Sequence, residues 1–429
     1  MNDTAVPAER TLAQWLAWQE QLHPSAMDLG LERVGAVKAR MGLGQPAPVV
    51  ITVAGTNGKG SSVAMLEAMY RAGGYRVGAY TSPHLLRYNE RIRIAGEDVS
   101  DDALCDAFAR VDAARGTTSL TYFEFGTLAA LDLFARANLD VVVLEVGLGG
   151  RLDAVNIVDA DCALITSIDI DHTEWLGDNR EAIGFEKAGI FRAGRPAVCG
   201  DAAPPSSVLQ HAAALGVTLY CAERDFSYRR DQASWHWSAG EARRSGLPFP
   251  RLRGPYQLDN AAAVLMVVHV LQTRLPLAQS HIRTGLSTVE LAGRFQVLPS
   301  RRRVILDVAH NPHGARALAR ALREQPCTGR TIAVFAMLND KDIAGVGAAL
   351  DDQIDAWYCA GLTGPRGTSA LHLVAELQRL PVRGLVYTHS DVAEALRAAL
   401  ADASESDRVV VFGSFHTVAP ALQDLLDQA

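Results

Sequence analysis

Short runs of apolar, β-branched residues alternate along this chain with stretches of helical periodicity, and no other feature limits the possible folds as strongly. The run "PVVITVAG" at 48–55 predicts a buried strand, because a strand covered on both faces is continuously apolar. Further strand candidates at 139–150 and 161–177 end in glycine-rich or polar loops, and helical patterns such as 121–138 lie between them. We therefore expect an α/β fold with a mainly parallel sheet covered by helices on both faces.

The 429 residues exceed one ordinary core, so we expect two domains. The alternation weakens at 226–253, which predicts a small antiparallel excursion. "LAGRFQVLPS" then combines Gly and Pro with little periodicity, and further strand candidates follow it. We predict an N-terminal domain at 1–288, a linker at 289–300 and a smaller Rossmann-like α/β domain at 301–429.

Composition excludes several classes of protein. Hydrophobic residues make up 48% and charged residues 21%, which is typical of a soluble globular chain. The net charge of -7, without a basic block, argues against nucleic acid as a partner. The six cysteines form no C-x-x-C pair, which predicts reduced thiols in the cytoplasm. No signal peptide or membrane span is expected. A monomer that binds small molecules is our default.

The loop "VAGTNGKGSS" at 53–62 resembles a phosphate-binding loop but departs from G-x-x-x-x-G-K-[ST] at Val53 and Gly60. It lies between a predicted strand and a predicted helix, the context that such a loop requires. Its glycines let backbone N–H groups wrap a phosphate, and Lys59 adds a positive charge. Ser61 or Ser62 offers a hydroxyl to Mg²⁺. The alternative is a tight glycine turn, but such a turn needs no lysine, so we predict a P-loop ATPase-like N-terminal domain.

Other polar residues follow predicted strands of the same domain. Ser82 and His84 belong to a turn that binds a ligand or is merely structural. Glu145 ends an apolar strand, where a buried carboxylate needs Mg²⁺ or an ion pair with Arg151. His172 lies beside acidic residues but lacks the neighbours of a zinc site.

Lys187 lies in a mostly apolar helix. The pattern alone favours an ammonium that reaches solvent. A desolvated lysine would instead have a depressed pKa, and its neutral amine could add CO₂ to give a carbamate that ligates Mg²⁺. In the second domain, polar loops after predicted strands suggest one face of a cleft and carry Asp307, His310, Asn311, Asp340, Lys341, Ser414 and His416.

Together these motifs resemble the Mur ligase superfamily, and within it the bifunctional bacterial dihydrofolate synthase/folylpolyglutamate synthase family. The shared motifs follow the family's order over nearly the whole chain: "GTNGKGS", "TSPHL", "LEVGLGGRLDAVN", "DHTEWLG", "EKAGIF", "GRFQ", "DVAHNP", "DKD" and "GSFHTV". The unusual phosphate loop is then a family variant. Val155 stands where the family pattern has Thr, so a hydroxyl is lost.

The resemblance implies the roles of the remaining candidates. ATP would be contacted by Asn57, Gly58, Lys59, Gly60, Ser61, Asn260, Arg294 and Asp307. Mg²⁺ would be held by Ser82, Glu145, His172 and carbamylated Lys187. The catalytic residues would be Lys59, His172, Lys187 and His310, and glutamate would meet Ser414 and His416. A pterin would be bound by Asp28, Leu29, Gly30, Leu31, Thr121, Tyr122, Phe123, Glu124, Leu152, Asp153 and Ala154. From the residues alone, "TYFEFG" could equally be a helix start that buries aromatic side chains.

The activity so implied is ATP-dependent amide ligation through an acyl phosphate, with dihydropteroate, tetrahydrofolate and L-glutamate as substrates. A Mur-type ligase acting on another precursor would share the ATP loops but lack the pterin segments. A P-loop regulatory ATPase would need neither Lys187 nor "DVAHNP".

Overall fold

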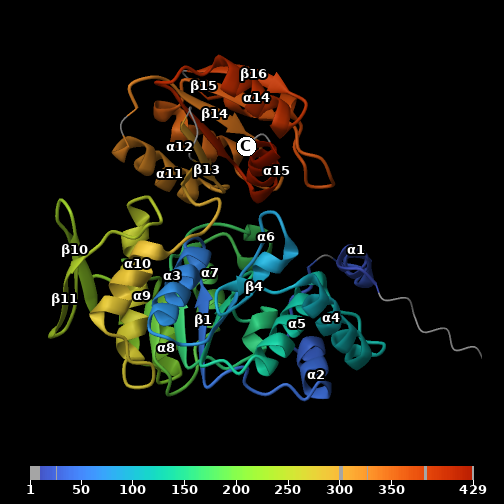
Figure 1. Ribbon diagram of the computed structural model, residues 1–429, viewed down its shortest axis with the longest axis vertical. Helices are drawn as coiled ribbons and strands as arrows, with labels where there is room; N and C mark the ends of the chain where they lie inside the picture. The colour runs from blue at the N-terminus through green and yellow to red at the C-terminus, as the bar shows by residue number, and fades with distance from the viewer. Residues whose placement is uncertain (1–9, 26, 299–302, 326, 381–383, 428–429) are drawn as a thin grey trace, which may run out of the picture. The chain divides into compact units, whose positions relative to one another are not determined.

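The computed structural model describes residues 10–25, 27–298, 303–325, 327–380 and 384–427 (Figure 1). By packing, the chain forms two units. The first comprises the described residues up to Ser82, Asn89–Ser227 and Ala263–Gly285. The second comprises Pro83–Tyr88, Tyr228–Ala262 and the described residues from Leu286 onward.

The first unit is built on an eight-stranded sheet among the described residues, in the order β4-β3-β2-β5-β1-β6-β7-β8. Its strands are β1 (Val49–Ala54), β2 (Val77–Tyr80), β3 (Ile92–Ile94), β4 (Glu97–Asp98), β5 (Val141–Glu145), β6 (Cys162–Ile165), β7 (Ala197–Cys199) and β8 (Leu219–Cys221). From β2 to β8 along the sheet every pair is parallel, while β3 and β4 extend the edge antiparallel. All residues of β1 are buried, as the apolar run predicted.

Helices and short 3₁₀ turns precede, connect and follow these strands. They are α1 (Leu12–Leu22), α2 (Glu32–Arg40), α3 (Lys59–Ala72), η1 (Tyr88–Arg91), α4 (Asp101–Arg115), α5 (Tyr122–Arg136), η2 (Ala154–Ile157), α6 (Thr173–Leu176), α7 (Arg180–Ala188), α8 (Ser206–Ala214), α9 (Tyr256–Val270) and α10 (Gln279–Thr288). Rings of α1, α4 and α5 pack together: the centroid of Phe125 lies 5.8 Å from that of Trp18 and 5.6 Å from that of Phe108. No described helix is long and apolar enough to cross a membrane.

The expected antiparallel excursion is a small sheet in the order β11-β10-β9. Its strands are β9 (Phe226–Arg230), β10 (Trp235–Ala239) and β11 (Ala242–Leu247), and β10 pairs antiparallel with β11. Burial alternates along β10, so that Trp235 and Trp237 point to one covered face.

The second unit contains a six-stranded sheet in the order β12-β13-β17-β14-β15-β16. Its strands are β12 (Gln296–Leu298), β13 (Arg303–Asp307), β14 (Thr331–Phe335), β15 (Ala356–Ala360), β16 (Leu385–His389) and β17 (Arg408–Phe412). The connecting elements are α11 (Pro312–Glu324), α12 (Ile343–Leu350), η3 (Asp351–Gln353), α13 (Ala370–Gln378), α14 (Val392–Asp402) and α15 (Phe415–Asp427). The strands β13 to β17 are parallel, which confirms the predicted Rossmann-like α/β fold.

The predicted linker needs one correction. Residues Gln296–Leu298 form β12, which pairs antiparallel with β13. A strand this short has no periodicity to read, and it forms because its backbone satisfies the edge of the sheet. Residues 299–302, at the end of the predicted linker and the start of the next domain, lie outside the described residues. The predicted boundaries at 288 and 301 stay predictions.

Candidate active site

The predicted site residues of the first unit follow four neighbouring strands. Because β1 lies between β5 and β6, and β2 lies beside β5, the carboxyl ends of these parallel strands meet at one edge of the sheet. Ser82 follows β2, Glu145 ends β5, the loop at 55–58 follows β1, and His172 lies in the loop after β6. Open α/β sheets bind ligands at this edge.

Glycine is required at two positions of the phosphate loop. Gly55 has φ +151°, and a Cβ there would lie 1.8 Å from Oγ1 of Thr166. Gly58 has φ +89° and caps α3, which begins at Lys59. The Lys59 ammonium donates to the carbonyl oxygens of Gly55 at 2.9 Å and Thr56 at 3.1 Å, so the loop curls around its own lysine. Both the helix N-terminus and this ammonium favour an anion here.

The loop after β6 braces the phosphate loop, a role that the sequence reasoning missed. The Thr56 N–H donates to the Ser167 carbonyl at 2.7 Å. The hydroxyls of Thr166 and Ser167 donate to the Asn57 carbonyl at 2.6 and 3.1 Å. The only available signal was that both residues lie near the end of a predicted strand.

Glu145 is 4% exposed, and its Oε2 accepts a hydrogen bond from the Ser82 N–H at 3.3 Å. Arg151, its alternative ion-pair partner, lies instead 2.8 Å from Oε1 of Glu186. A buried carboxylate beside a serine offers the hard oxygen donors that Mg²⁺ prefers, so the residues present fit this ion. In the described part of the chain, no three His, Cys, Asp or Glu side chains form a metal cluster by themselves.

Lys187 is only 3% exposed, which rules out an ammonium that reaches solvent. Burial, together with the positive charge of Lys59, lowers the pKa of its amine to about 7, while Asp171 acts in the opposite direction. His172 adopts left-handed backbone angles, with φ +53°, at the start of α6. Its Nε2 lies 3.9 Å from Oδ2 of Asp171.

The glycine-rich loop after β5 packs directly on α7. A Cβ on Gly150 would lie 2.8 Å from the Glu186 carbonyl oxygen, so only glycine permits this approach. Asp153 is fully buried and accepts hydrogen bonds from the N–H groups of Leu148 at 2.8 Å and Val155 at 3.0 Å. Burial raises the pKa of its carboxyl to about 7.

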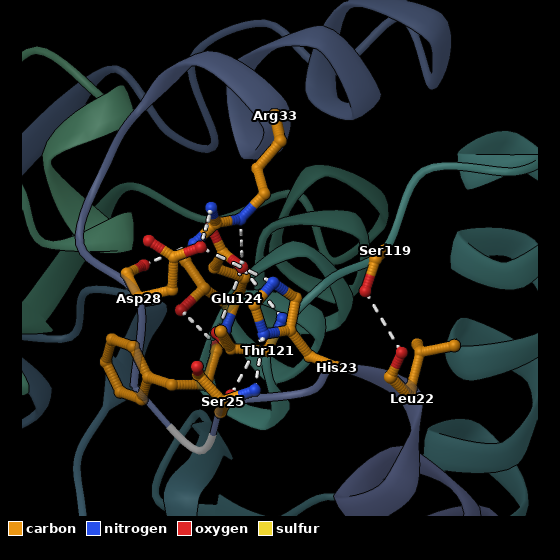
Figure 2. A network of polar contacts seen from close by, with 10 residues as sticks. Leu22, His23, Ser25, Asp28, Arg33, Ser119, Thr121 and Glu124 are labelled. Carbon is orange, nitrogen blue, oxygen red and sulfur yellow. Dashed lines mark hydrogen bonds and ion pairs between the residues drawn. The ribbon is translucent and has the colours of Figure 1, made fainter.

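Two of the predicted pterin residues contact the same side chain (Figure 2). Arg33 donates from Nε to Oε2 of Glu124 at 3.0 Å, and its terminal nitrogens donate to the carboxylate and the carbonyl of Asp28. Glu124 also accepts from the Thr121 N–H at 2.8 Å and completes a capping box at the start of α5. The Phe123 ring centroid lies 6.0 Å from that of Tyr80. Arg33 was not predicted as a site residue, because its partner Glu124 lies 91 residues later and no local pattern reveals such a contact.

The other predicted pterin residues differ in exposure. Tyr122, Leu152, Leu29, Gly30 and Leu31 are half-buried. Ala154 is buried at the start of η2.

In the second unit, Asp307 ends β13 and is buried. It accepts hydrogen bonds from the N–H groups of Phe295 and Ala309, both at 2.8 Å. Burial raises the pKa of its carboxyl, against the opposing charge of Arg294. The Arg294 guanidinium lies 5.1 Å from the ring centroid of Phe415.

The remaining candidates of this unit serve local structure as well. Nδ1 of His310 lies 2.9 Å from the Val308 carbonyl oxygen, so Nδ1 carries the proton that this bond needs. The Asn260 amide donates to Oε1 of Gln257 at 3.0 Å. Ser414 is buried and accepts from the Thr417 N–H at 3.0 Å, whereas His416 is exposed.

Comparisons with known proteins agree on a family. The description "Mur ligase middle domain" matches residues 53–268, and "Mur ligase, glutamate ligase domain" matches residues 293–415. The dihydrofolate synthase/folylpolyglutamate synthase of Escherichia coli K12 is 48% identical over 416 residues, or 97% of this chain and 96% of that protein.

Two solved structures are similar along nearly their whole length. E. coli FolC in complex with DHPP and ADP has a TM-score of 0.94 at 47% identity, covering 99% of this chain and 100% of that one. A bifunctional folylpolyglutamate synthase/dihydrofolate synthase with Mn, AMPPNP and L-glutamate bound has a TM-score of 0.90 at 51% identity, covering 97% of this chain and 98% of that one.

Proposed function

The chain belongs to the Mur ligase family, and from this premise we infer that it joins L-glutamate to 7,8-dihydropteroate at the expense of ATP. The product is dihydrofolate, and the same enzyme adds further glutamates to tetrahydrofolates. The observation that carries this function is the 48% identity to a dihydrofolate synthase/folylpolyglutamate synthase over 97% of the chain. The enzyme uses ATP and a divalent metal ion, as the similar proteins solved with Mn and AMPPNP do.

The chemistry requires an activated carboxylate. A carboxylate is a poor electrophile, so transfer of the ATP γ-phosphoryl group converts it to an acyl phosphate. The glutamate amine then attacks the carbonyl carbon, a tetrahedral intermediate forms, and phosphate leaves, with ADP as the other product. The protein contributes position and charge neutralisation to both steps.

We propose that the loop from Asn57 to Ser61 holds the ATP phosphates. Its backbone N–H groups and the Lys59 ammonium neutralise the transferred charge. Ser82 and Glu145 would hold Mg²⁺ against the same phosphates. When bound, Mg²⁺ supplies further neutralisation of the phosphoryl oxygens.

Lys187 and His172 are proposed for a second metal position. The buried Lys187 amine is neutral above its pKa of about 7, so it can add CO₂ and release one proton. The carbamate formed is an anionic oxygen ligand in a place where a free ammonium would repel a metal ion.

Further ATP contacts are proposed for Asn260, Arg294 and Asp307, with His310 near the γ-phosphate. Ser414 and His416 are proposed to meet glutamate. We also propose that the enzyme is a cytoplasmic monomer whose partners are small molecules.

The pterin is proposed to bind at 28–31, 121–124 and 152–154. Phe123 offers a ring for stacking, and the loop backbones offer hydrogen bonds. These segments separate a folate ligase from a Mur-type ligase that acts on another precursor.

ADP release with Mg-ATP and L-glutamate tests the function directly. Release that requires dihydropteroate would establish the synthase, and release with tetrahydrofolate would establish the second activity. ADP release that does not depend on any pterin would be consistent with the proposed ATP chemistry but would contradict the proposed pterin substrate.

A further inference from the structure

The short helix α2 is bonded to two of the three segments at which the pterin is proposed to bind, and to the 3₁₀ turn η2, which begins at the last residue of the third. These segments are far apart in the sequence, at 28–31, 121–124 and 152–154. Arg33, in its first turn, reaches the first two segments, and Lys38, in its last turn, reaches Ile157 at the end of η2. The inference below rests on the proposed function, because the pterin segments themselves are part of that proposal.

Arg33 joins the first two segments with a single planar group. Nε donates to Oε2 of Glu124 at 3.0 Å, and the two terminal nitrogens donate to the side chain and the backbone of Asp28 (Figure 2). Glu124 is 3% exposed and is itself fixed to the start of α5 by the N–H and hydroxyl of Thr121, at 2.8 and 3.0 Å. A guanidinium has its donors in a fixed fork, so these bonds fix the loop against the helix in one geometry.

Lys38 reaches the 3₁₀ turn η2 rather than the third segment itself. Its ammonium donates to the Ile157 carbonyl oxygen at 3.0 Å, at the end of η2. Ile157 lies three residues after Ala154, on the 3₁₀ turn that Asp153 caps. Burial lowers the pKa of the Lys38 amine, although the charge of Asp159 opposes this shift.

A second consequence concerns Asp28. Its carboxylate already pairs with Arg33, and Nε2 of His23 lies 3.4 Å from the same oxygen. A carboxylate with these partners is better suited to shape its loop than to accept the N–H groups of a ligand.

We propose that Arg33 and Lys38 are positioning residues for the pterin substrate. Arg33 holds 28–31 against 121–124, and Lys38 holds η2, whose first residue ends the third segment. Neither side chain touches the reacting atoms. Loss of either side chain then weakens the binding of dihydropteroate and leaves the binding of ATP unchanged, because the phosphate loop is braced separately by Thr166 and Ser167.

The same helix provides a matched control. Arg40 donates to the Ala114 carbonyl at 2.8 Å and to the Thr118 hydroxyl at 2.8 Å. It also donates to the Arg115 carbonyl at 3.1 Å, and these acceptors belong to the end of α4 and the loop after it, not to a proposed pterin segment or to η2. Arg40→Met therefore removes comparable hydrogen bonds from α2 and reports what a purely structural loss does.

The experiment measures initial rates of ADP release for the full chain and for Arg33→Met, Arg33→Lys, Lys38→Met and Arg40→Met. For Arg33→Met we expect the KM for dihydropteroate to rise about tenfold or more, because charged hydrogen bonds are lost. The KM for ATP should stay within about twofold. Arg33→Lys keeps the positive charge but loses the forked donors of the guanidinium. Its KM for dihydropteroate should therefore lie between those of the wild type and of Arg33→Met. Lys38→Met should raise the same KM by about threefold, and Arg40→Met should leave it within about twofold.

The proposal is overturned if both Arg33 variants keep the wild-type KM for dihydropteroate. It is also overturned if the KM values for dihydropteroate and ATP rise together, or if Arg40→Met raises the first as much as Arg33→Met does. If Arg33→Met does not fold, the KM values of Arg33→Lys and Lys38→Met for dihydropteroate test the proposal instead. A wild-type enzyme without pterin-dependent ADP release would refute the proposed function itself, and this inference with it. If the wild-type enzyme turns over normally and the variants keep its KM for dihydropteroate, only this inference is refuted and the proposed function is not.

Discussion

At the scale of single residues, Lys187 has the environment least like that of a lysine in water. It is 3% exposed, and the neighbouring positive charge of Lys59 adds to the cost of protonating it. The local pattern of α7 could not reveal this, because an isolated lysine in an apolar helix usually reaches solvent. Burial of Lys187 depends on elements that the sequence separates widely, the phosphate loop and the loop after β6.

If Lys187 acts as a carbamate, a small carboxylate can replace the lost group. Lys187→Ala should lose most of its activity, and added formate or acetate should restore part of it by filling the space with an anionic oxygen donor. Rates of ADP release with increasing carboxylate measure this rescue. The alanine variant of His172 is the control, since no carboxylate should rescue it. Full activity of Lys187→Ala without added carboxylate would contradict the carbamate.

The same burial predicts a pH dependence of stability. The folded-state pKa of about 7 lies below the ordinary value of 10.5, so the unfolded chain holds more protons between these pH values. Stability therefore rises with pH across this window, and below it the folded state carries a buried charge at full cost. Lys187→Met should be more stable than wild type below pH 7, with an advantage that shrinks toward pH 10. Urea unfolding in CO₂-free buffer checks this, and a constant difference would refute it.

Gln19 presents a different kind of misfit. It is 1% exposed in α1, and neither its amide nitrogen nor its oxygen finds a hydrogen-bond partner among the described residues. An unpaired buried amide costs free energy that an apolar side chain of similar size does not. Gln19→Leu should therefore raise the free energy of unfolding by about 1–2 kcal/mol. The exposed Gln21→Leu is the matched control and should change it by less than about 0.5 kcal/mol. Equal effects of the two substitutions would show that Gln19 is paired.

At the scale of elements, the phosphate loop depends on its neighbour after β6. Gly55→Ala would combine φ +151° with a Cβ 1.8 Å from Thr166 Oγ1, so the loop must shift. We expect the Kd for ADP to rise at least about tenfold, measured by calorimetry. Thr166→Ala in the same chain should recover part of the loss. Gly74→Ala is the control, because Gly74 has φ +87° but open space around it. An unchanged Kd for Gly55→Ala would mean that the loop does not hold the nucleotide.

The elements also show where sequence patterns suffice and where they fail. The position of Glu145 could be predicted, because the end of a continuous apolar strand is visible in the sequence and parallel strands share an edge. The helix α2 was not predicted from the sequence, because Gly35 and the many charged residues of this helix weaken the helical pattern. The strand β12 was not predicted either, because an edge strand this short forms through its pairing with β13 and not through a pattern of its own. Both missed elements carry tertiary contacts, which no local pattern contains.

At the scale of the whole molecule, the α/β class and the parallel sheets followed from alternating periodicity, and the small antiparallel excursion followed from its weakening at 226–253. The path that the chain takes from one packed unit to the other could not be predicted from this periodicity. Leu85 belongs to the core of the second unit, and so does Phe295. The sequence around Leu85 reads as the loop after β2, and its destination depends on long-range packing that periodicity cannot encode.

This path predicts what happens when the chain is cut between Leu298 and Arg303. The first fragment, 1–298, then carries Leu85 and β12, which belong to the core and the sheet edge of the second unit. The second fragment, 303–429, lacks them. Loss of β12 would expose unpaired backbone along β13, and loss of Phe295 would leave the buried Asp307 carboxylate without one of its donors.

The two fragments, expressed together with a tag on one, should therefore copurify and retain ADP release. Fragment 303–429 expressed alone should unfold at lower urea concentration than the corresponding transition in the intact chain. Size-exclusion chromatography of the tagged pair measures the association. Fragments that elute apart, each folded, would show that the contacts of β12 and Leu85 are dispensable and that the predicted boundary at 301 marks an independent domain.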